Sequence, residues 1–351
     1  MTRTARSKPA SATSDAEPSA RPTASISAVA QRAGVSIATV SRVTNGVANK
    51  ASPATVARVQ EAIAELGYRP VGAGRALRRR ESRLVAVLAA NLANPAMAAI
   101  AAAAEVALRN AGYVMVLCDT HDEPDLQDEY LLEMRAQYAC GLVLLGAVDS
   151  PVLRQFNATQ EPLIFVNRRN PVPGGQGRYV GIDHEQAGRD VADWFADSQM
   201  QSIALIHARL ASSATAGRVQ GFRAQLAARG ISVPSAHIQT LKSADHLQIG
   251  YTAMQKILDT GLPEAVFCTS DLIAYGAYRA ATERGALAGR DYALVGFDDS
   301  PLNPWIAPWL NAVRVPYDQY GAAIARVLRA QPGVQHDIVL SHKLIIRSSN
   351  P

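Results

Sequence analysis

Residues 27–46 of the 351-residue chain read SAVAQRAGVSIATVSRVTNG, and this stretch decides the fold of the N-terminal part. Small and apolar residues recur at helical spacing as far as Ala33, and Gly34 then ends the first segment. Ser36 is a typical N-cap for a second helical segment, which stops at Asn45 and Gly46. Two short helices joined by a turn that contains glycine are typical of a helix-turn-helix motif.

A third helical segment follows the motif and runs from Pro53 to Leu66. Ser52 stands before it as an N-cap, and Gly67 stands after it as a stop. Its apolar residues recur at helical spacing, which predicts one buried face formed by Val56, Val59, Ile63 and Leu66. An ordinary three-helix surface bundle is the alternative interpretation of the same pattern.

The second helical segment carries side chains that suit the reading of DNA in the major groove. Ala38, Thr39 and Ser41 are short and permit close approach to the bases. Ile37 can contact a thymine methyl group, and Arg42 can reach a guanine or a phosphate. The segment therefore predicts a recognition helix.

The charge of the chain is unevenly distributed. Residues 1–83 hold 14 Lys and Arg against 5 Asp and Glu, a net charge of +9, whereas residues 84–351 hold 21 against 25, a net charge of −4. A basic N-terminal part suits a polyanion such as DNA, although a basic tail that only aids solubility is the alternative. Residues 1–24 are rich in Ser, Ala, Thr and Pro, and we expect them to be disordered.

The N-terminal pattern resembles the lactose-repressor/galactose-repressor (LacI/GalR) family of bacterial regulators. The order and spacing of the matching residues are kept across the three helical segments. One departure is Ala28, where the family usually has an acidic residue, and this change removes no DNA-contacting side chain. The matching stretches are Val29-Ala30, Ala33-Gly34-Val35-Ser36, Ala38-Thr39-Val40-Ser41-Arg42-Val43, Asn45-Gly46 and Ile63-Ala64-Glu65-Leu66-Gly67-Tyr68-Arg69-Pro70.

The resemblance implies a DNA-binding domain at residues 25–69 and a hinge at 70–83, in which Leu77 holds the position of a leucine that enters the minor groove. Gly72 and Gly74 each disfavour a helix by about 1 kcal/mol relative to alanine, so we expect this hinge to be disordered without DNA. An anchoring contact of Leu77 on the rest of the protein is the alternative. The implied DNA-contacting residues are Ser25, Ile26, Ser36, Ile37, Ala38, Thr39, Ser41, Arg42, Asn45 and Leu77.

Residues 84–351 alternate strand-length apolar runs with helical stretches. This alternation predicts parallel sheets covered by helices on both faces, and the number of strands favours two α/β lobes over one sheet. Ligands of such sheets bind beyond the carboxyl ends of the strands, here in the cleft between the lobes. The expected strands are 84–89, 113–118, 141–145, 163–166, 203–206, 265–268 and 293–296, and the expected helices are 97–110, 126–137, 185–197, 218–229, 247–259 and 273–284.

The resemblance extends to the C-terminus and includes the periplasmic sugar-binding proteins. It implies a two-lobed sensor of a sugar or sugar derivative, in which Arg218 and Asp271 match effector-binding positions. An aspartate accepts hydrogen bonds from adjacent hydroxyl groups while an arginine donates them, which suits a polyol. Asp271 as a simple helix cap is the alternative. The matching motifs are Asn94-Pro95, 180–183 (VGID), 218–222 (RVQGF), 269–271 (TSD), 274–277 (AYGA) and 295–299 (VGFDD).

Further candidates for effector contacts follow strand ends or begin a helix in the first lobe: Met97, Asp119, Asn167 and Arg168. The pair Arg168-Arg169 would favour an anionic ligand, but a solvated or interface role is the alternative. Trp305 and Trp309 could stack on a sugar ring, or they could belong to the core. The segment 242–246, where the family often has an aromatic contact, does not align clearly and leaves the ligand class open.

Other classes of protein fit the sequence less well. The sequence contains no run of 18 or more apolar residues, so we expect no membrane span. We also find no secretory signal before the helix-turn-helix motif, which argues against a solute-binding protein of a transporter. The motifs GxSxG, GxxxxGK[ST] and HExxH are absent, so we expect no enzyme. Three scattered cysteines fit a reducing cytoplasm, and no histidine spacing predicts a metal or other cofactor. We therefore expect a cytoplasmic, nucleoid-associated repressor that binds operator DNA as a homodimer and responds to a small molecule.

Overall fold

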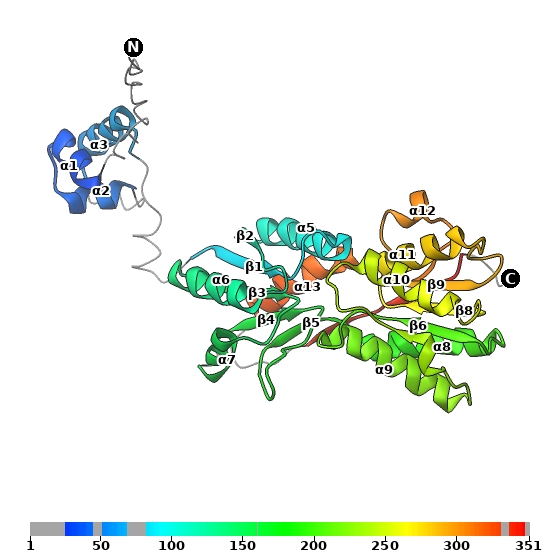
Figure 1. Ribbon diagram of the computed structural model, residues 1–351. Coiled ribbons are helices and arrows are strands. Elements are labelled where there is room, and N and C mark those ends of the chain that lie inside the picture. The colour runs from blue at the N-terminus through cyan, green and yellow to red at the C-terminus, as the bar shows by residue number, and fades with distance from the viewer. Residues whose placement is uncertain (1–24, 45–50, 69–81, 160, 331–336, 348–351) are drawn as a thin grey trace, which may run out of the picture. The chain divides into compact units, whose positions relative to one another are not determined.

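The computed structural model describes residues 25–44, 51–68, 82–159, 161–330 and 337–347. The chain divides into two compact units, Met1–Arg80 and Glu81–Pro351. Figure 1 colours the helices of the first unit blue, and the second unit runs from cyan to red.

The first unit is a bundle of three helices: α1 (Ile26–Ala33), α2 (Ile37–Thr44) and α3 (Pro53–Leu66). Its core is small, and Val29, Val40 and Val59 are fully buried in it, one from each helix. Gly34 ends α1 with φ +62°, a left-handed conformation that glycine adopts without steric cost. The predicted helix-turn-helix is confirmed.

The second unit contains two sheets of six strands each, so the predicted two-lobed α/β architecture is also confirmed. The first sheet has the strand order β11-β5-β4-β3-β1-β2, and its strands pair in parallel. The strands are β1 (Leu84–Ala89), β2 (Val114–Asp119), β3 (Gly141–Leu145), β4 (Leu163–Val166), β5 (Arg178–Ile182) and β11 (Ile338–Leu340). The helices of this lobe are α5 (Pro95–Asn110), α6 (Pro124–Ala136), α7 (Pro151–Ala158) and α13 (Tyr317–Arg329).

The second sheet has the order β12-β10-β9-β8-β6-β7. Its last strand in the chain, β12, pairs antiparallel with β10, so this sheet is mixed and not purely parallel as the sequence predicts. The strands are β6 (Ile203–Ile206), β7 (Ile238–Gln239), β8 (Ala265–Cys268), β9 (Ala293–Asp298), β10 (Asn311–Arg314) and β12 (Lys343–Ile345). The helices are α8 (His184–Asp197), α9 (Ser213–Ala228), α10 (His246–Leu258), α11 (Asp271–Glu283) and α12 (Asn303–Ile306).

The chain passes between the lobes at three places within the described ranges: between β5 and α8, between β10 and α13, and between β11 and β12. Because of the second crossing, α13 returns to the first lobe and packs on α5, and Figure 1 shows it in orange beside the cyan helix. The side chains that flank these crossings lie at the junction of the two lobes.

Glycines set the spacing of the helix pairs that carry the candidate site. A Cβ atom on Gly221 of α9 would lie 1.9 Å from the carbonyl oxygen of Glu185, and one on Gly188 of α8 would lie 2.2 Å from the carbonyl oxygen of Arg218. The backbones of α8 and α9 therefore touch along their length, and no larger side chain fits between them. This close approach places the start of α8 beside the first turns of α9.

Candidate functional sites: an exposed helix and an interlobe cleft

The outer face of α2 is open to solvent. Ile37 is 51% exposed, and Ala38 and Arg42 are also exposed. Ser36 begins the helix, and its hydroxyl oxygen accepts a hydrogen bond of 3.2 Å from the backbone N–H of Thr39. Ile37 in the first turn and Arg42 in the last turn are therefore both accessible, and these side chains suit the reading of base edges.

The other described residues of the predicted DNA contact belong to the starts of α1 and α2 and to α2 itself. Ser25 caps α1 by accepting a hydrogen bond of 3.2 Å from the backbone N–H of Ala28, so it has a structural role as well. Ile26, Thr39 and Ser41 are half-buried. Asn45 and Leu77 lie outside the described residues.

A cavity of about 230 Å³ lies between the two lobes of the second unit. The first lobe contributes the start of α5 to its wall, and the second lobe contributes the carboxyl end of β9 and the start of α11, as the strand-end rule predicts. Its polar lining includes Asn94, Asp271, Asp298, Ser300 and Tyr317. Its apolar lining includes Pro95, Leu247, Leu272, Leu302 and Ile306.

Arg218 is buried and is not itself among the residues that line this cavity, but it lies next to Asp298, which does. Its guanidinium carbon lies 3.5 Å from the centre of the Phe297 ring, and one terminal nitrogen donates a hydrogen bond of 2.6 Å to the carbonyl oxygen of Thr269. The other terminal nitrogen is 4.0 Å from Oδ1 of Asp298. Burial lowers the pKa of Arg218 and Asp298 opposes this shift, but an arginine retains its proton in proteins. The site therefore holds a fixed positive charge.

His184, the first residue of α8, connects Arg218 to the first lobe. Its Nδ1 accepts a hydrogen bond of 3.3 Å from Nε of Arg218, and its Nε2 lies 2.9 Å from the carbonyl oxygen of Asn167. Burial and the charge of Arg218 lower the pKa of His184 well below its usual value. The imidazole is neutral at physiological pH as a result.

Asp271 is the first residue of α11 and is 2% exposed. Its Oδ2 accepts hydrogen bonds from the backbone N–H of Ser300 at 2.7 Å and from the side-chain amide of Asn303 at 3.0 Å. Its Oδ1 is buried and has no hydrogen-bond partner among the described residues. Burial and the neighbouring Asp298 raise the pKa of Asp271 well above its usual value. The helix cap itself is Ser270, so the cap interpretation does not account for Asp271.

Asp298 and Tyr317 are site residues that the sequence analysis did not select. Asp298 ends β9 with φ +115°, a conformation that costs a non-glycine residue energy and is found at functional sites. The hydroxyl of Tyr317 donates a hydrogen bond of 2.8 Å to Oδ1 of Asp298. Two consecutive aspartates directly after a buried strand were a signal for Asp298. No sequence signal pointed to Tyr317, because it reaches the cleft only through the second crossing.

Of the four other predicted effector residues, Met97, Asp119 and Arg168 make contacts within the first lobe, whereas the backbone carbonyl of Asn167 contacts His184 of the second lobe. Met97 is buried in the core, and the Asp119 carboxylate accepts backbone hydrogen bonds from Leu92 at 3.0 Å and His121 at 3.1 Å. Both terminal nitrogens of Arg168 bond to the carboxylate of Asp122. Asn167 takes part through its backbone carbonyl and has φ +65°.

His246, the last residue of the segment 242–246, lies on the side of the cleft that the second lobe forms. Its Nδ1 lies 2.9 Å from Oγ of Ser270, and burial together with the charge of Arg168 lowers its pKa to about 4. The two tryptophans lie elsewhere: Trp305 is 84% exposed, and Trp309 stacks on Tyr278 with ring centroids 3.9 Å apart.

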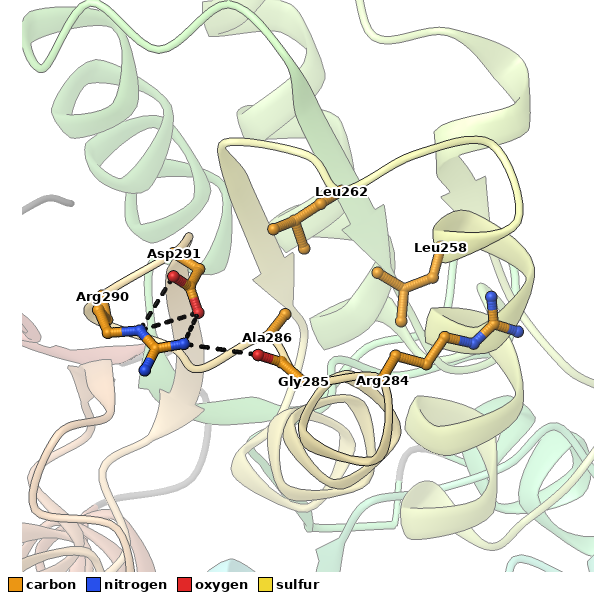
Figure 2. A pocket seen from close by; sticks show the side chains of 7 residues that line it. All are labelled: Leu258, Leu262, Arg284, Gly285, Ala286, Arg290 and Asp291. Atoms are coloured by element: carbon orange, nitrogen blue, oxygen red, sulfur yellow. Dashed lines mark hydrogen bonds and ion pairs between the residues drawn. The ribbon is translucent and has the colours of Figure 1, made fainter.

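A second hollow lies at the opposite edge of the second sheet, where β8 and β9 begin. Figure 2 shows it between Leu258, Leu262 and the end of α11, with Arg290 bound to Asp291. Arg284, which also lines it, is paired with Asp259 at 2.7 Å. Both guanidinium groups are thus neutralised, and the hollow lies away from the carboxyl ends of the strands, so it is a weaker ligand site than the interlobe cavity.

Within the described part of the chain, no helix is both long enough and apolar enough to span a membrane.

Comparisons with known proteins match both units. Residues 25–71 match the model of the bacterial regulatory proteins of the lacI family, and residues 82–299 match the periplasmic binding proteins and sugar-binding domain of that family. The chain is 33% identical to the helix-turn-helix transcriptional regulator CelR of Thermobifida fusca, with 88% of this chain and 91% of the relative covered.

Two solved structures agree with this match. The lac repressor dimer, bound to operator and an anti-inducer, superposes with a TM-score of 0.77 at 26% identity and covers 93% of this chain and 98% of its own. The complex of CelR with cellobiose has a TM-score of 0.69 at 29% identity and covers 94% of this chain and 100% of its own. These relatives are transcription regulators and not enzymes. The chain therefore belongs to the LacI family of bacterial transcription regulators, and its second unit is the sugar-binding sensor domain of that family.

Proposed function

We propose that the chain is a cytoplasmic repressor that binds operator DNA as a homodimer, and that an uncharged sugar in the interlobe cavity controls this binding. The observation that carries the effector assignment is Asp271, which lines the cavity and whose buried Oδ1 has no partner among the described residues. A buried polar atom without a partner costs about 1–3 kcal/mol, and a ligand hydroxyl would recover that energy.

The chemistry around the cavity favours hydroxyl groups over charged groups. Asp271 and Asp298 supply carboxyl groups on one side, and a carboxyl group can exchange hydrogen bonds with the adjacent hydroxyls of a sugar ring in either protonation state. Arg218 supplies donors, but its charge is already opposed by Asp298 at 4.0 Å. Arg168 donates from both terminal nitrogens to the carboxylate of Asp122, so its charge is already paired within the first lobe. No Lys or Arg is among the described residues that line the cavity, so a negatively charged ligand would find no cationic partner in its wall.

The apolar wall suits the other face of a sugar ring. Leu247, Leu302 and Ile306 line the cavity and are between 47% and 58% exposed, so they gain burial when a ligand covers them. A sugar presents C–H groups on one face and hydroxyls around its edge, and it would bury these side chains at about 25 cal/mol per Å² of apolar area.

A thermal-shift screen tests the assignment. The probes are cellobiose, D-glucose, D-galactose and D-ribose as uncharged sugars, with D-gluconate and glucose 6-phosphate as anions. We expect an uncharged sugar to raise the melting temperature in a concentration-dependent way, since a ligand of the folded state stabilises it by mass action. Asp271→Asn and Arg218→Met should each remove the shift. Arg284→Met, which changes the hollow in Figure 2, is the matched control and should keep it.

Two results would contradict this proposal. A shift produced by the anions alone would show that the cleft recognises charge. A sugar-induced shift that survives in both Asp271→Asn and Arg218→Met but disappears in Arg284→Met would move the site to the opposite edge of the sheet.

The DNA-binding half of the proposal is supported by the exposed face of α2. Arg42 and Ile37 would read bases, and Ser25, Ile26, Ser36, Ala38, Thr39 and Ser41 would support the contact. Asn45 and Leu77, the latter within the proposed hinge at 70–83, would add contacts from outside the described residues. A homodimer requires a near-palindromic operator, because two-fold symmetry of the protein is matched by two-fold symmetry of the site.

A further inference from the structure

We propose that His184 is the positioning residue of the effector site: as a neutral imidazole protonated on Nε2, it orients Arg218 and ties it to the first lobe. This role goes beyond the binding of an effector, and it rests on the proposed function only in assigning Arg218 to the ligand.

The contacts of His184 allow one tautomer. A guanidinium has donors and no acceptor, so Nε of Arg218 at 3.3 Å requires Nδ1 of His184 to be the acceptor. The single ring proton must then be on Nε2, where it is donated to the carbonyl oxygen of Asn167 at 2.9 Å. An imidazolium would direct a second N–H at Arg218, and the opposite tautomer would leave both contacts unmade.

The charged groups around His184 favour the neutral ring from several elements. Burial is the main cause of its lowered pKa, and the charge of Arg218 on α9 is the next. His342, between β11 and β12, and Arg169, after β4, lower it further, while the Asn167 carbonyl opposes them. Phe297 of β9 packs against the ring with centroids 6.1 Å apart and adds no charge. These surroundings favour the neutral ring, and the contacts to Arg218 and Asn167 select its tautomer.

The Asn167 carbonyl makes His184 a connection between lobes. Asn167 follows β4 of the first lobe, and its left-handed backbone also accepts a hydrogen bond of 3.3 Å from the hydroxyl of Tyr179. Two residues later, the backbone N–H of Arg169 donates to Oγ of Ser213 on α9 at 2.8 Å. The segment 167–169 is therefore held to the second lobe at both of its ends, and His184 makes one of the two connections.

The first test reads the tautomer in the ligand-free, full-length protein. Nitrogen-15 NMR of histidine-labelled protein distinguishes Nδ1–H, Nε2–H and doubly protonated rings, and loss of one signal in His184→Gln assigns it. We expect the neutral Nε2–H form at pH 7 in the wild type. An Nδ1–H tautomer or an imidazolium at pH 7 in the wild type would overturn the proposal.

The second test measures the connection between lobes by hydrogen exchange of the Arg169 amide. His184→Leu removes both ring contacts, so we expect exchange about tenfold faster, equivalent to about 1.4 kcal/mol. His184→Gln can still accept from Arg218 and donate to Asn167, and it should restore a rate close to wild type. His237→Leu is the matched control, since His237 also contacts a backbone carbonyl, that of Ile203, but within the second lobe.

The outcomes separate this inference from the proposed function. An Arg169 amide that exchanges at the wild-type rate in His184→Leu would refute the connection, whatever the sugar screen shows. If His184→Leu does not fold, the proposal is still tested by the tautomer of the wild-type ring and by the exchange rate of the Arg169 amide in His184→Gln. If no uncharged sugar raises the melting temperature, the proposed effector class is refuted. The tautomer of His184 and the exchange rate of the Arg169 amide can still be interpreted, because both are measured without a ligand.

Discussion

The hydroxyl of Tyr317 donates a hydrogen bond of 2.8 Å to Oδ1 of Asp298, and this bond joins the two lobes at the second crossing of the chain. Tyr317 begins α13 of the first lobe, whereas Asp298 ends β9 of the second. We expect Tyr317→Phe to lower the free energy of unfolding by about 1–3 kcal/mol, because it leaves a buried acceptor with one partner fewer. Chemical denaturation measures this change.

Tyr320 provides the control for that substitution within the same helix. Its hydroxyl is buried and has no hydrogen-bond partner among the described residues, so Tyr320→Phe should be neutral or slightly stabilising. Equal decreases in the free energy of unfolding in Tyr317→Phe and Tyr320→Phe would mean that the hydrogen bond to Asp298 makes no specific contribution to stability.

The carboxyl of Asp298 gives a testable pH dependence. Burial, opposed by Arg218 and Tyr317, raises its pKa from 3.8 to about 6. A folded-state pKa above the unfolded one favours folding while the group is protonated, so this contribution is lost as the pH rises through about 6. We therefore expect Asp298→Asn to gain stability relative to wild type between pH 4 and pH 7, by about 3 kcal/mol at most.

The comparison with wild type at each pH is essential to this measurement. The lowered pKa of His246, about 4, acts in the opposite direction, because stability held by a neutral histidine is lost as the pH falls. Denaturation at several pH values should show the relative gain in Asp298→Asn. This pH-dependent gain in stability should be absent in Asp125→Asn, which removes an exposed carboxyl on α6. If the difference in unfolding free energy between Asp298→Asn and wild type stays constant from pH 4 to pH 7, the raised pKa of Asp298 is contradicted.

Arg42 should determine which operator the protein prefers. Arg42→Ala is expected to lower affinity for the preferred sequence by about 1–3 kcal/mol and to relax the choice of one base pair. Arg58→Ala is the control, since it removes an exposed arginine from α3 instead of α2. Selection from a random DNA library followed by binding at several salt concentrations separates base reading from phosphate contact. An unchanged preferred sequence in Arg42→Ala would show that α2 is not the reading helix.

The close contact of α8 and α9 should tolerate no added methyl group. Gly221→Ala would place a Cβ 1.9 Å from the carbonyl oxygen of Glu185, so the helices must separate, at a cost of about 1–3 kcal/mol or more. The separation would also move His184 away from Arg218. Gln220→Ala, an exposed neighbour on α9, should leave stability nearly unchanged in the same denaturation experiment. A Gly221→Ala variant as stable as wild type would contradict the packing.

The sequence predicted those elements that local patterns specify. The helix-turn-helix was recognisable because Ser36, Gly34 and a short apolar stripe act within a few residues of one another. Buried parallel strands such as β3 and β8 were visible as continuous apolar runs. The strands β5, β7, β10, β11 and β12 were missed, since most are short and lie near sheet edges, and so were the helices α7, α12 and α13.

The sequence by itself determined the two-part organisation and the α/β class of the sensor and selected Arg218 and Asp271 as candidate effector contacts, all from short-range spacing or matching motifs. Only the tertiary structure brought Tyr317 and Asp298 together, placed His184 between Arg218 and Asn167, and bound Arg168 to Asp122 within its own lobe. These contacts join residues between 17 and 46 positions apart. Such pairs depend on where the chain crosses between lobes, and no local periodicity records that path.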